Sequence, residues 1–121
     1  MPQILVIDDD LQTLFLLREM LDQAGYGVLV APDGKEGIRV CESTRVDLVI
    51  TDVLMPEMEG LAVIMALRRE FTGIKIIAVS GGGRIGPDDY LKMAGKLGAN
   101  RTFTKPLGRN VLLDAVKELV G

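Results

Sequence analysis

The chain of 121 residues contains no histidine and no tryptophan, and Cys41 is its only cysteine. These absences exclude, within the chain, a disulfide framework, a zinc site built from cysteine and histidine, and a catalytic triad that depends on histidine. A metal ion bound by this chain must therefore be held by oxygen atoms.

Long apolar runs and clusters of positive charge are also missing. No apolar run approaches the roughly 20 residues that a helix needs to cross a bilayer, and Met1-Pro2-Gln3 leads directly into a strand-like stretch rather than a signal peptide. The net charge is −3 and lysine and arginine are dispersed, so nothing favours nucleic acid or anionic lipid. We expect a cytoplasmic protein that binds neither nucleic acid nor a membrane directly.

The remaining composition is that of a globular protein, with 48% hydrophobic and 26% charged residues. The length is near the usual size of one domain. We expect residues 1–121 to form one domain.

Five short apolar runs have the appearance of β-strands. They cover residues 4–7, 28–31, 48–51, 74–79 and 101–104. Several contain no alternating polar residues, which is typical of parallel strands covered by helices on both faces.

Helical patterns follow each run. The first shows helical spacing and ends at Gly25, which predicts one buried stripe. The members of this stripe are Thr13, Leu16, Leu17, Met20, Leu21 and Ala24. Later helices are expected from the cap Asp33 to about Cys41 and over residues 59–70, 87–97 and 109–120. Five strand–helix units predict an α/β open doubly wound sheet, with functional residues at the carboxyl ends of the strands.

Acidic residues stand directly after two of the expected strands. The first strand leads into Asp8-Asp9-Asp10, and the third leads into Asp52. Asp10 is expected to cap the first helix, whereas the other three should meet in one crevice because the first and third strands are neighbours in such a sheet. Clustered carboxylates repel one another unless a cation intervenes, and Mg²⁺ prefers oxygen ligands of this kind.

Ser80 ends the fourth expected strand, and Lys105 follows the fifth. Taken singly, they read as a turn residue and a surface charge. A hydroxyl donor, an ammonium group and a metal ion around one carboxylate would stabilise a phosphoryl group during transfer. Together they predict that the site forms an aspartyl phosphate, with the carboxylate as nucleophile.

The sequence resembles the receiver domain of two-component response regulators over nearly its whole length. The resemblance rests on ILVIDDD at residues 4–10, DLVITDVLMPEMEG at 47–60, IAVS at 77–80, GA at 98–99 and TKP at 104–106. It implies a flavodoxin-like fold with strand order 2-1-3-4-5. The same resemblance implies that the protein catalyses its own phosphorylation and dephosphorylation without being a conventional enzyme.

The resemblance also assigns a role to each site residue. Asp52 would be the phosphoacceptor, and Asp9, Asp52 and the backbone carbonyl of Leu54 would bind Mg²⁺, with Asp8 acting through water. Ser80 and Lys105 would contact the phosphoryl oxygens. The family usually has a cis peptide bond where this chain has Lys105–Pro106.

The donor implied by the resemblance is a phosphohistidine on a sensor histidine kinase or a histidine phosphotransfer protein. The downstream target is unknown from the sequence, and either a monomer or a phosphorylation-dependent dimer is compatible with it. The sequence ends at Gly121, just after the last expected helix, which is compatible with a receiver that acts on its own.

Two departures from the family concern signalling. Ser80 is followed by Gly81, Gly82 and Gly83, and the position that is commonly aromatic in the family is Thr102. We expect the glycines to form a switch loop that becomes ordered on phosphorylation, with Ser80 and Thr102 as the other switch positions. The family usually binds its targets with the fourth helix, fifth strand and fifth helix.

A docking surface for the donor is expected near the same site. Leu11, Leu14 and Phe15 lie off the expected buried stripe of the first helix, and Pro106 lies beside the site. We expect the three first-helix residues to be partly exposed and to receive a helical phosphodonor. The alternative is that they pack against the loop after Lys105.

Three other functions fit parts of the pattern less well. A magnesium-dependent phosphatase with an aspartate nucleophile would need a cap or specificity insertion, for which the chain has no room. A flavodoxin-like binding module would need a phosphate loop rich in serine and threonine and an aromatic platform. A receiver that binds partners without phosphorylation would be expected to lack some of the five site residues, all of which are present.

Overall fold

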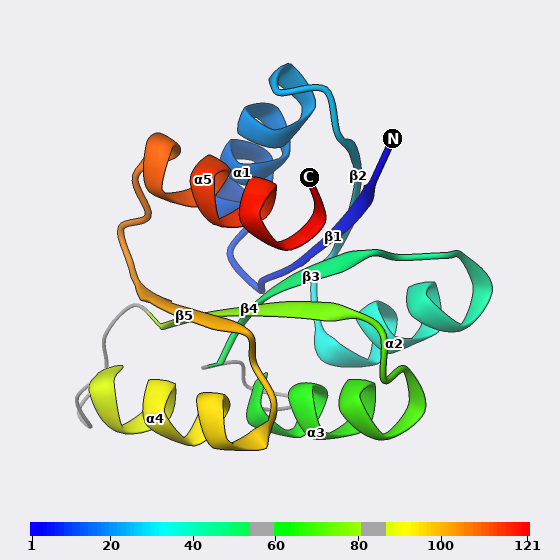
Figure 1. Cartoon of the computed structure of the whole chain (residues 1–121), viewed down its shortest axis with the longest axis vertical. Helices are drawn as coiled ribbons and strands as arrows, with labels where there is room; N and C mark the ends of the chain where they lie inside the picture. The colour runs from blue at the N-terminus through cyan, green and yellow to red at the C-terminus, as the bar shows by residue number, and fades with distance from the viewer. Residues whose placement is uncertain (54–59, 81–86) are drawn as a thin grey trace.

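The computed structural model describes residues 1–53, 60–80 and 87–121, with the backbone alone for residues 87–91. Strands and helices alternate along the described chain (Figure 1). The strands are β1 (Gln3–Ile7), β2 (Gly27–Ala31), β3 (Leu48–Asp52), β4 (Lys75–Ser80) and β5 (Arg101–Thr104). The helices are α1 (Leu11–Gln23), α2 (Gly34–Ser43), α3 (Gly60–Glu70), α4 (Pro87–Leu97) and α5 (Arg109–Val120). Within the described part, no helix is long and apolar enough to span a membrane.

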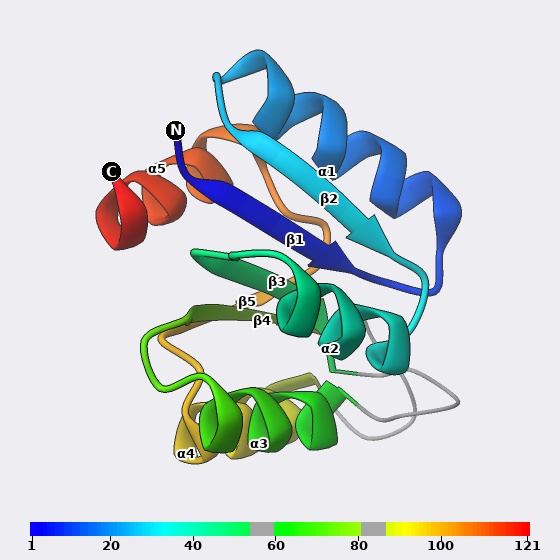
Figure 2. The same cartoon turned by 90° about the vertical axis from the view of Figure 1, so that its right-hand side faces the viewer.

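The five strands form one parallel sheet in the order β2-β1-β3-β4-β5. This arrangement confirms the expected α/β doubly wound fold and its strand order. The strand ends agree with the sequence prediction to within one residue. Because all strands run in the same direction, their carboxyl ends lie along one edge of the sheet, as the arrowheads of β1 and β2 show in Figure 2.

Helices cover both faces of the sheet. Helices α1 and α5 lie on one face, and α2, α3 and α4 lie on the other (Figures 1 and 2). Successive residues of a strand point to opposite faces, so each strand contributes to both cores. Leu5, Val49 and Ile76 pack with the α2–α3–α4 layer, whereas Val6 and Ile50 pack with α1 and α5. This two-sided burial explains the continuous apolar runs in the sequence.

The buried stripe of α1 differs from the sequence prediction. Leu14, Leu17 and Leu21 are buried, whereas Leu16 is 54% exposed and Ala24 is also exposed. Apolar residues spread around most of this helix. The spacing of apolar residues in the sequence is therefore compatible with more than one buried stripe. Tertiary packing selects the residues that contact Ile4, Val6 and the α5 core. The prediction that Leu14 is partly exposed was therefore wrong, because its side chain is 4% exposed and belongs to the core.

Candidate functional site

Asp8 and Asp52 are brought together by the pairing of β1 with β3. Ile7 pairs with Thr51 at the carboxyl end of this ladder, so the next residue of each strand projects from the same edge of the sheet. Both aspartates are nearly inaccessible to solvent, at 2% exposed for Asp8 and 7% for Asp52. Buried carboxylates are costly unless they are paired, and the fold accordingly supplies a cation.

That cation is Lys105, which follows β5. Its Nζ lies 2.8 Å from Oδ2 of Asp8 and 3.0 Å from Oδ2 of Asp52. Burial by itself lowers the pKa of Lys105, but the hydrogen bonds and charges of Asp8 and Asp52 outweigh burial and raise the pKa above its ordinary value of 10.5. The ammonium group is therefore charged at neutral pH and bridges the two carboxylates. The Lys105–Pro106 peptide bond is cis, as the resemblance implied.

The three consecutive aspartates have three different environments. Asp8 also accepts a hydrogen bond from the backbone N–H of Asp10 at 2.9 Å. Asp10 caps α1, because its side chain accepts hydrogen bonds from the N–H of Gln12 and the hydroxyl of Thr13. Asp9 is exposed. The predicted capping role of Asp10 is confirmed, and it separates Asp10 from the metal candidates.

The geometry and chemistry of the carboxylates fit a hard divalent cation. Asp8, Asp9 and Asp52 each offer an oxygen, and these oxygens lie within 4.8 Å of one another. The ammonium of Lys105 pairs with two of these carboxylates, Asp8 and Asp52, and clustered carboxylates of this kind favour a bound cation. Mg²⁺ is commonly bound by one or two carboxylates together with water and phosphate oxygens. These residues therefore suit Mg²⁺.

Ser80 ends β4 beside this cluster. The preceding residue, Val79, pairs with Asp52 in the sheet. The backbone carbonyl of Ser80 accepts a hydrogen bond from the backbone N–H of Lys105 at 2.9 Å. The Ser80 side chain is fully buried, and its Oγ has no hydrogen-bond partner in the described part of the chain. A buried hydroxyl without a partner costs stability, and proteins often keep such a group because it binds a ligand.

An apolar cavity of about 380 Å³ adjoins the site on the α1 side of the sheet. Leu16 and Leu17 of α1 and Pro106 and Leu107 after β5 form part of its wall, while Asp8, Asp52 and Lys105 line its polar part. The carboxylate cluster therefore borders both solvent and an apolar surface.

Several other predicted residues can now be placed. Leu11 and Phe15 are 60% and 64% exposed, and Pro106 is exposed. Thr102 is exposed on β5, whereas Phe103 is partly buried against the α1–α5 core. Four predicted residues lie outside the part of the chain that the structure describes, namely Leu54, Gly81, Gly82 and Gly83.

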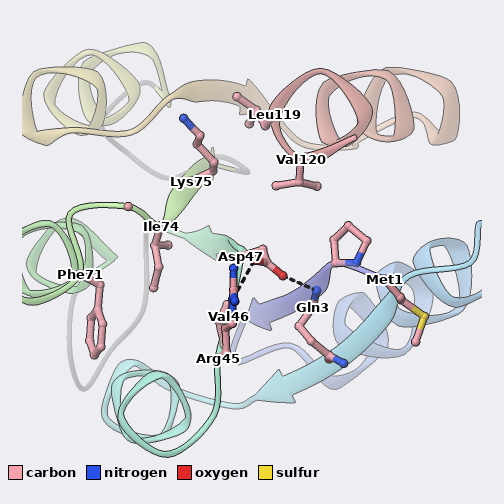
Figure 3. Close-up of a pocket in the computed structure, with 12 residues that line it drawn as sticks. Met1, Gln3, Arg45, Val46, Asp47, Phe71, Ile74, Lys75, Leu119 and Val120 are labelled. Atoms are coloured by element: carbon pink, nitrogen blue, oxygen red, sulfur yellow. Dashed lines mark hydrogen bonds and ion pairs between the residues drawn. The ribbon is translucent and has the colours of Figure 1, made fainter.

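A larger hollow of about 880 Å³ lies at the opposite edge of the sheet and contains none of the predicted residues (Figure 3). Asp47 supplies the one carboxylate that lines it among the described residues; this carboxylate accepts the backbone N–H of Gln3 at 2.9 Å and lies 3.6 Å from Nε of Arg45. Nearby, Cys41 is buried, and its pKa is raised to about 11 by burial and by the charge of Glu42. The thiol is therefore protonated at neutral pH and unsuited to act as a nucleophile.

Gly60 is a feature of the site that sequence reasoning did not single out. It is the last residue of the motif at 47–60, and it lies against the backbone of Asp52. The available signal was a glycine at the start of an expected helix, close in sequence to the candidate nucleophile.

The fold and this site define a parallel α/β protein with an acidic, lysine-bridged centre at the carboxyl ends of its strands. The family model of the response regulator receiver domain matches residues 4–117, so the chain belongs to the response regulator receiver family. Receiver domains of two-component systems are phosphorylated on aspartate with the help of Mg²⁺ and take the phosphoryl group from histidine kinases. They also have autophosphorylation and autodephosphorylation activity.

Characterised relatives include two bacterial regulators. The chain is 30% identical over 119 residues to the alkaline phosphatase synthesis transcriptional regulatory protein PhoP of Bacillus subtilis, covering 98% of this chain and 48% of PhoP. It is 35% identical over 115 residues to the transcriptional regulatory protein GlrR of Escherichia coli, covering 95% of this chain and 25% of GlrR. The chain thus spans about half or about a quarter of the length of these relatives.

Solved structures agree with the family. A response regulator receiver domain protein from Clostridium thermocellum superposes with a TM-score of 0.92 at 29% identity, covering 99% of this chain and 94% of that one. The response regulator TrrA from Thermotoga maritima, solved in complex with Mg²⁺ and BeF, has a TM-score of 0.85 at 31% identity and covers 99% and 100% of the two chains.

Proposed function

We propose that residues 1–121 act as one receiver unit in which Asp52 accepts a phosphoryl group from a phosphohistidine of a partner kinase or phosphotransfer protein. The observation that carries this proposal is the geometry around Asp52. Its buried carboxylate lies 3.0 Å from the ammonium of Lys105 and within reach of the carboxylates of Asp8 and Asp9. Perturbed, charge-coupled groups at strand ends are typical of functional sites.

In the proposed reaction, a carboxylate oxygen of Asp52 forms a bond to phosphorus as the bond between phosphorus and the donor imidazole nitrogen breaks. The electron pair of the broken bond returns to the imidazole. Asp9, Asp52 and the carbonyl of Leu54 would hold a magnesium ion, with Asp8 acting through water, and the bound ion would supply positive charge to the site. Lys105 would add a second positive charge, and the hydroxyl of Ser80, which has no partner among the described residues, is available as a hydrogen-bond donor.

The first prediction tests this assignment directly. With Mg²⁺ and acetyl phosphate, the wild-type protein should gain one phosphoryl group and Asp52→Asn should gain none, because an amide cannot act as the nucleophile. Asp114→Asn removes an exposed carboxylate of α5 and serves as the matched control. Intact-mass measurement distinguishes the outcomes. Labelling of Asp52→Asn at the wild-type level, or labelling unchanged when Mg²⁺ is chelated, would disprove the proposed reaction.

We further propose that the donor docks on exposed apolar residues beside the site. Leu11, Phe15 and Pro106 are exposed, and the apolar cavity next to Asp52 opens between α1 and the segment after Lys105. Contiguous exposed apolar surface is costly in water, and it is typical of a helix-binding groove. Leu14 does not belong to this surface, because its side chain is part of the core.

The proposed switch begins at Ser80. In this proposal, the buried hydroxyl moves toward the phosphoryl group and the segment from Gly81 to Gly83 becomes ordered as it follows. Thr102 offers no aromatic ring that would respond by changing its rotamer. Ordering costs roughly 1–2 kcal/mol of backbone entropy per residue, which the phosphoryl contacts must offset, so the coupling to a target should be modest.

Hydrogen exchange tests docking and switching in one experiment. We expect the donor protein to protect amides around Leu11 and Phe15, and phosphorylation to protect residues 81–89 far more than residues around Thr102. Asp52→Asn provides the control, because it should respond to the donor but not to acetyl phosphate. Donor binding without protection of α1 would refute the docking surface. Phosphorylation without protection of residues 81–89 would refute the switch.

A further inference from the structure

The first residue of α3 lies against the peptide backbone of the site. Gly60 is buried, and its N–H donates a hydrogen bond to the carbonyl of Val53 at 3.2 Å. Val53 directly follows Asp52 and directly precedes Leu54. The chain thus leaves the site at Val53 and returns to the same residue at Gly60.

A side chain at position 60 has no room. A Cβ built on Gly60 would lie 2.8 Å from the carbonyl carbon of Asp52, and closer still to the carbonyl oxygen of Asp52 and the Cα of Val53. Cβ atoms essentially never lie within 3.0 Å of atoms outside their own and the adjacent residues. All three obstructing atoms belong to the backbone and therefore cannot rotate aside as a side chain can.

Other glycines show that this contact is unusual in kind. A Cβ at Gly37 would meet the side chain of Ile7, and one at Gly27 would meet the flexible end of Gln3. Those neighbours can move without changing the backbone of the site. At Gly60, the group that must move is the peptide that carries the proposed phosphoacceptor.

We infer that Gly60 is a positioning residue for phosphoryl acceptance, a role that rests on the function proposed for Asp52. The missing side chain lets the start of α3 lie directly on the Asp52 and Val53 peptides. This contact fixes the peptide that carries the Asp52 carboxylate opposite Lys105. A larger residue would displace Asp52, which is both the proposed nucleophile and an expected metal ligand.

Gly60→Ala tests the inference, and Gly95→Ala is the matched control. Gly95 also lies in a helix, and a Cβ built there has nothing within 4 Å. For each protein we would measure the Mg²⁺ dissociation constant by calorimetry, the phosphorylation rate from acetyl phosphate at saturating Mg²⁺, and the fraction folded by circular dichroism. Sucrose, which favours the folded state, would be added to all samples if Gly60→Ala is only partly folded.

We expect folded Gly60→Ala to bind Mg²⁺ at least about 10-fold more weakly, as is usual when the support of a metal ligand is lost. Its phosphorylation rate should fall by about 10-fold to 100-fold, because a misplacement of about 1 Å can cost about 100-fold. Gly95→Ala should match the wild type in both. A protein that is merely less stable would keep both values in its folded fraction.

Two results would overturn the inference. One is a folded Gly60→Ala with wild-type Mg²⁺ affinity and rate. The other is a Gly60→Ala that stays unfolded in sucrose, which would show that the glycine serves the fold as a whole. If the wild type itself is not phosphorylated, the proposed function fails, but Mg²⁺ affinity and the NMR positions of the Asp52 and Val53 amides still decide whether Gly60 positions the site.

Discussion

The two edges of the sheet differ in how their polar groups are paired. At the amino edge, Asp47 accepts the N–H of Gln3, donates its own N–H to the carbonyl of Gln3, and accepts the N–H of Lys75 on its carbonyl. At the carboxyl edge, the ammonium of Lys105 bridges the carboxylates of Asp8 and Asp52, an oxygen of Asp9 lies within 4.8 Å of theirs, and the hydroxyl of Ser80 has no partner among the described residues.

This difference separates a polar group that holds the fold together from one that is kept for a ligand. The interactions of Asp47 join the starts of β1, β3 and β4, so they are sufficient to account for its presence. At the other edge, the clustered carboxylates and a buried hydroxyl without a partner among the described residues cost stability, which is typical of groups kept for a ligand. The larger hollow is at the amino edge, so hollow size alone would have indicated the wrong end of the molecule.

In a comparison of the two edges, the largest expected effect comes from removing the bridging cation. Lys105→Met should slow phosphorylation from acetyl phosphate by about 100-fold or more, because it removes a charged group that faces the developing negative charge. Lys75→Met removes an exposed lysine that lines the amino-edge hollow and should leave the rate unchanged. Rapid-quench phosphorylation assays on both variants measure the difference. Equal slowing in the two variants would abolish the distinction between the edges.

A smaller effect of another kind is expected at the amino edge. Asp47→Ala should lower the free energy of unfolding by about 1–3 kcal/mol, because the N–H of Gln3 loses a charged hydrogen-bond acceptor. The rate of phosphorylation in the folded protein should not change.

Glu118→Ala is the control for Asp47→Ala. It removes one partner of the exposed ion pair with Arg101 and should cost at most about 1 kcal/mol. Urea denaturation measures both variants. If Asp47→Ala slows phosphorylation in folded protein, Asp47 contributes to the site as well as to the fold.

The sequence predicts the strands better than it predicts the orientation of α1. Each strand is a short apolar run bounded by polar residues. Because both faces of the sheet are buried, the strand can be recognised without knowing which side chains point to which face. In α1, apolar residues occupy more of the helix surface than the core can cover. The choice of Leu14 over Leu16 depends on contacts with β1, β3 and α5, which local spacing does not contain.

The candidate site was predictable where strand ends carry its residues. Asp8, Asp52, Ser80 and Lys105 each end or follow a strand, so parallel topology suffices to bring them together. The lysine's contact with both carboxylates depends on side-chain reach across two strand ends. The closeness of Gly60 to Asp52 depends on how α3 packs, and neither follows from spacing along the chain.

The start of α3 on the Asp52 peptide has an electrostatic consequence. Aligned peptide dipoles place about half a positive charge at the amino end of a helix. Helix α1 begins directly after Asp10, and α3 begins in contact with the backbone of Asp52, so two such ends lie beside the carboxylates. Together they amount to about one positive charge that belongs to the main chain. This positive electrostatic potential at the site comes from the folded backbone. It should persist in every side-chain variant that preserves the two helices.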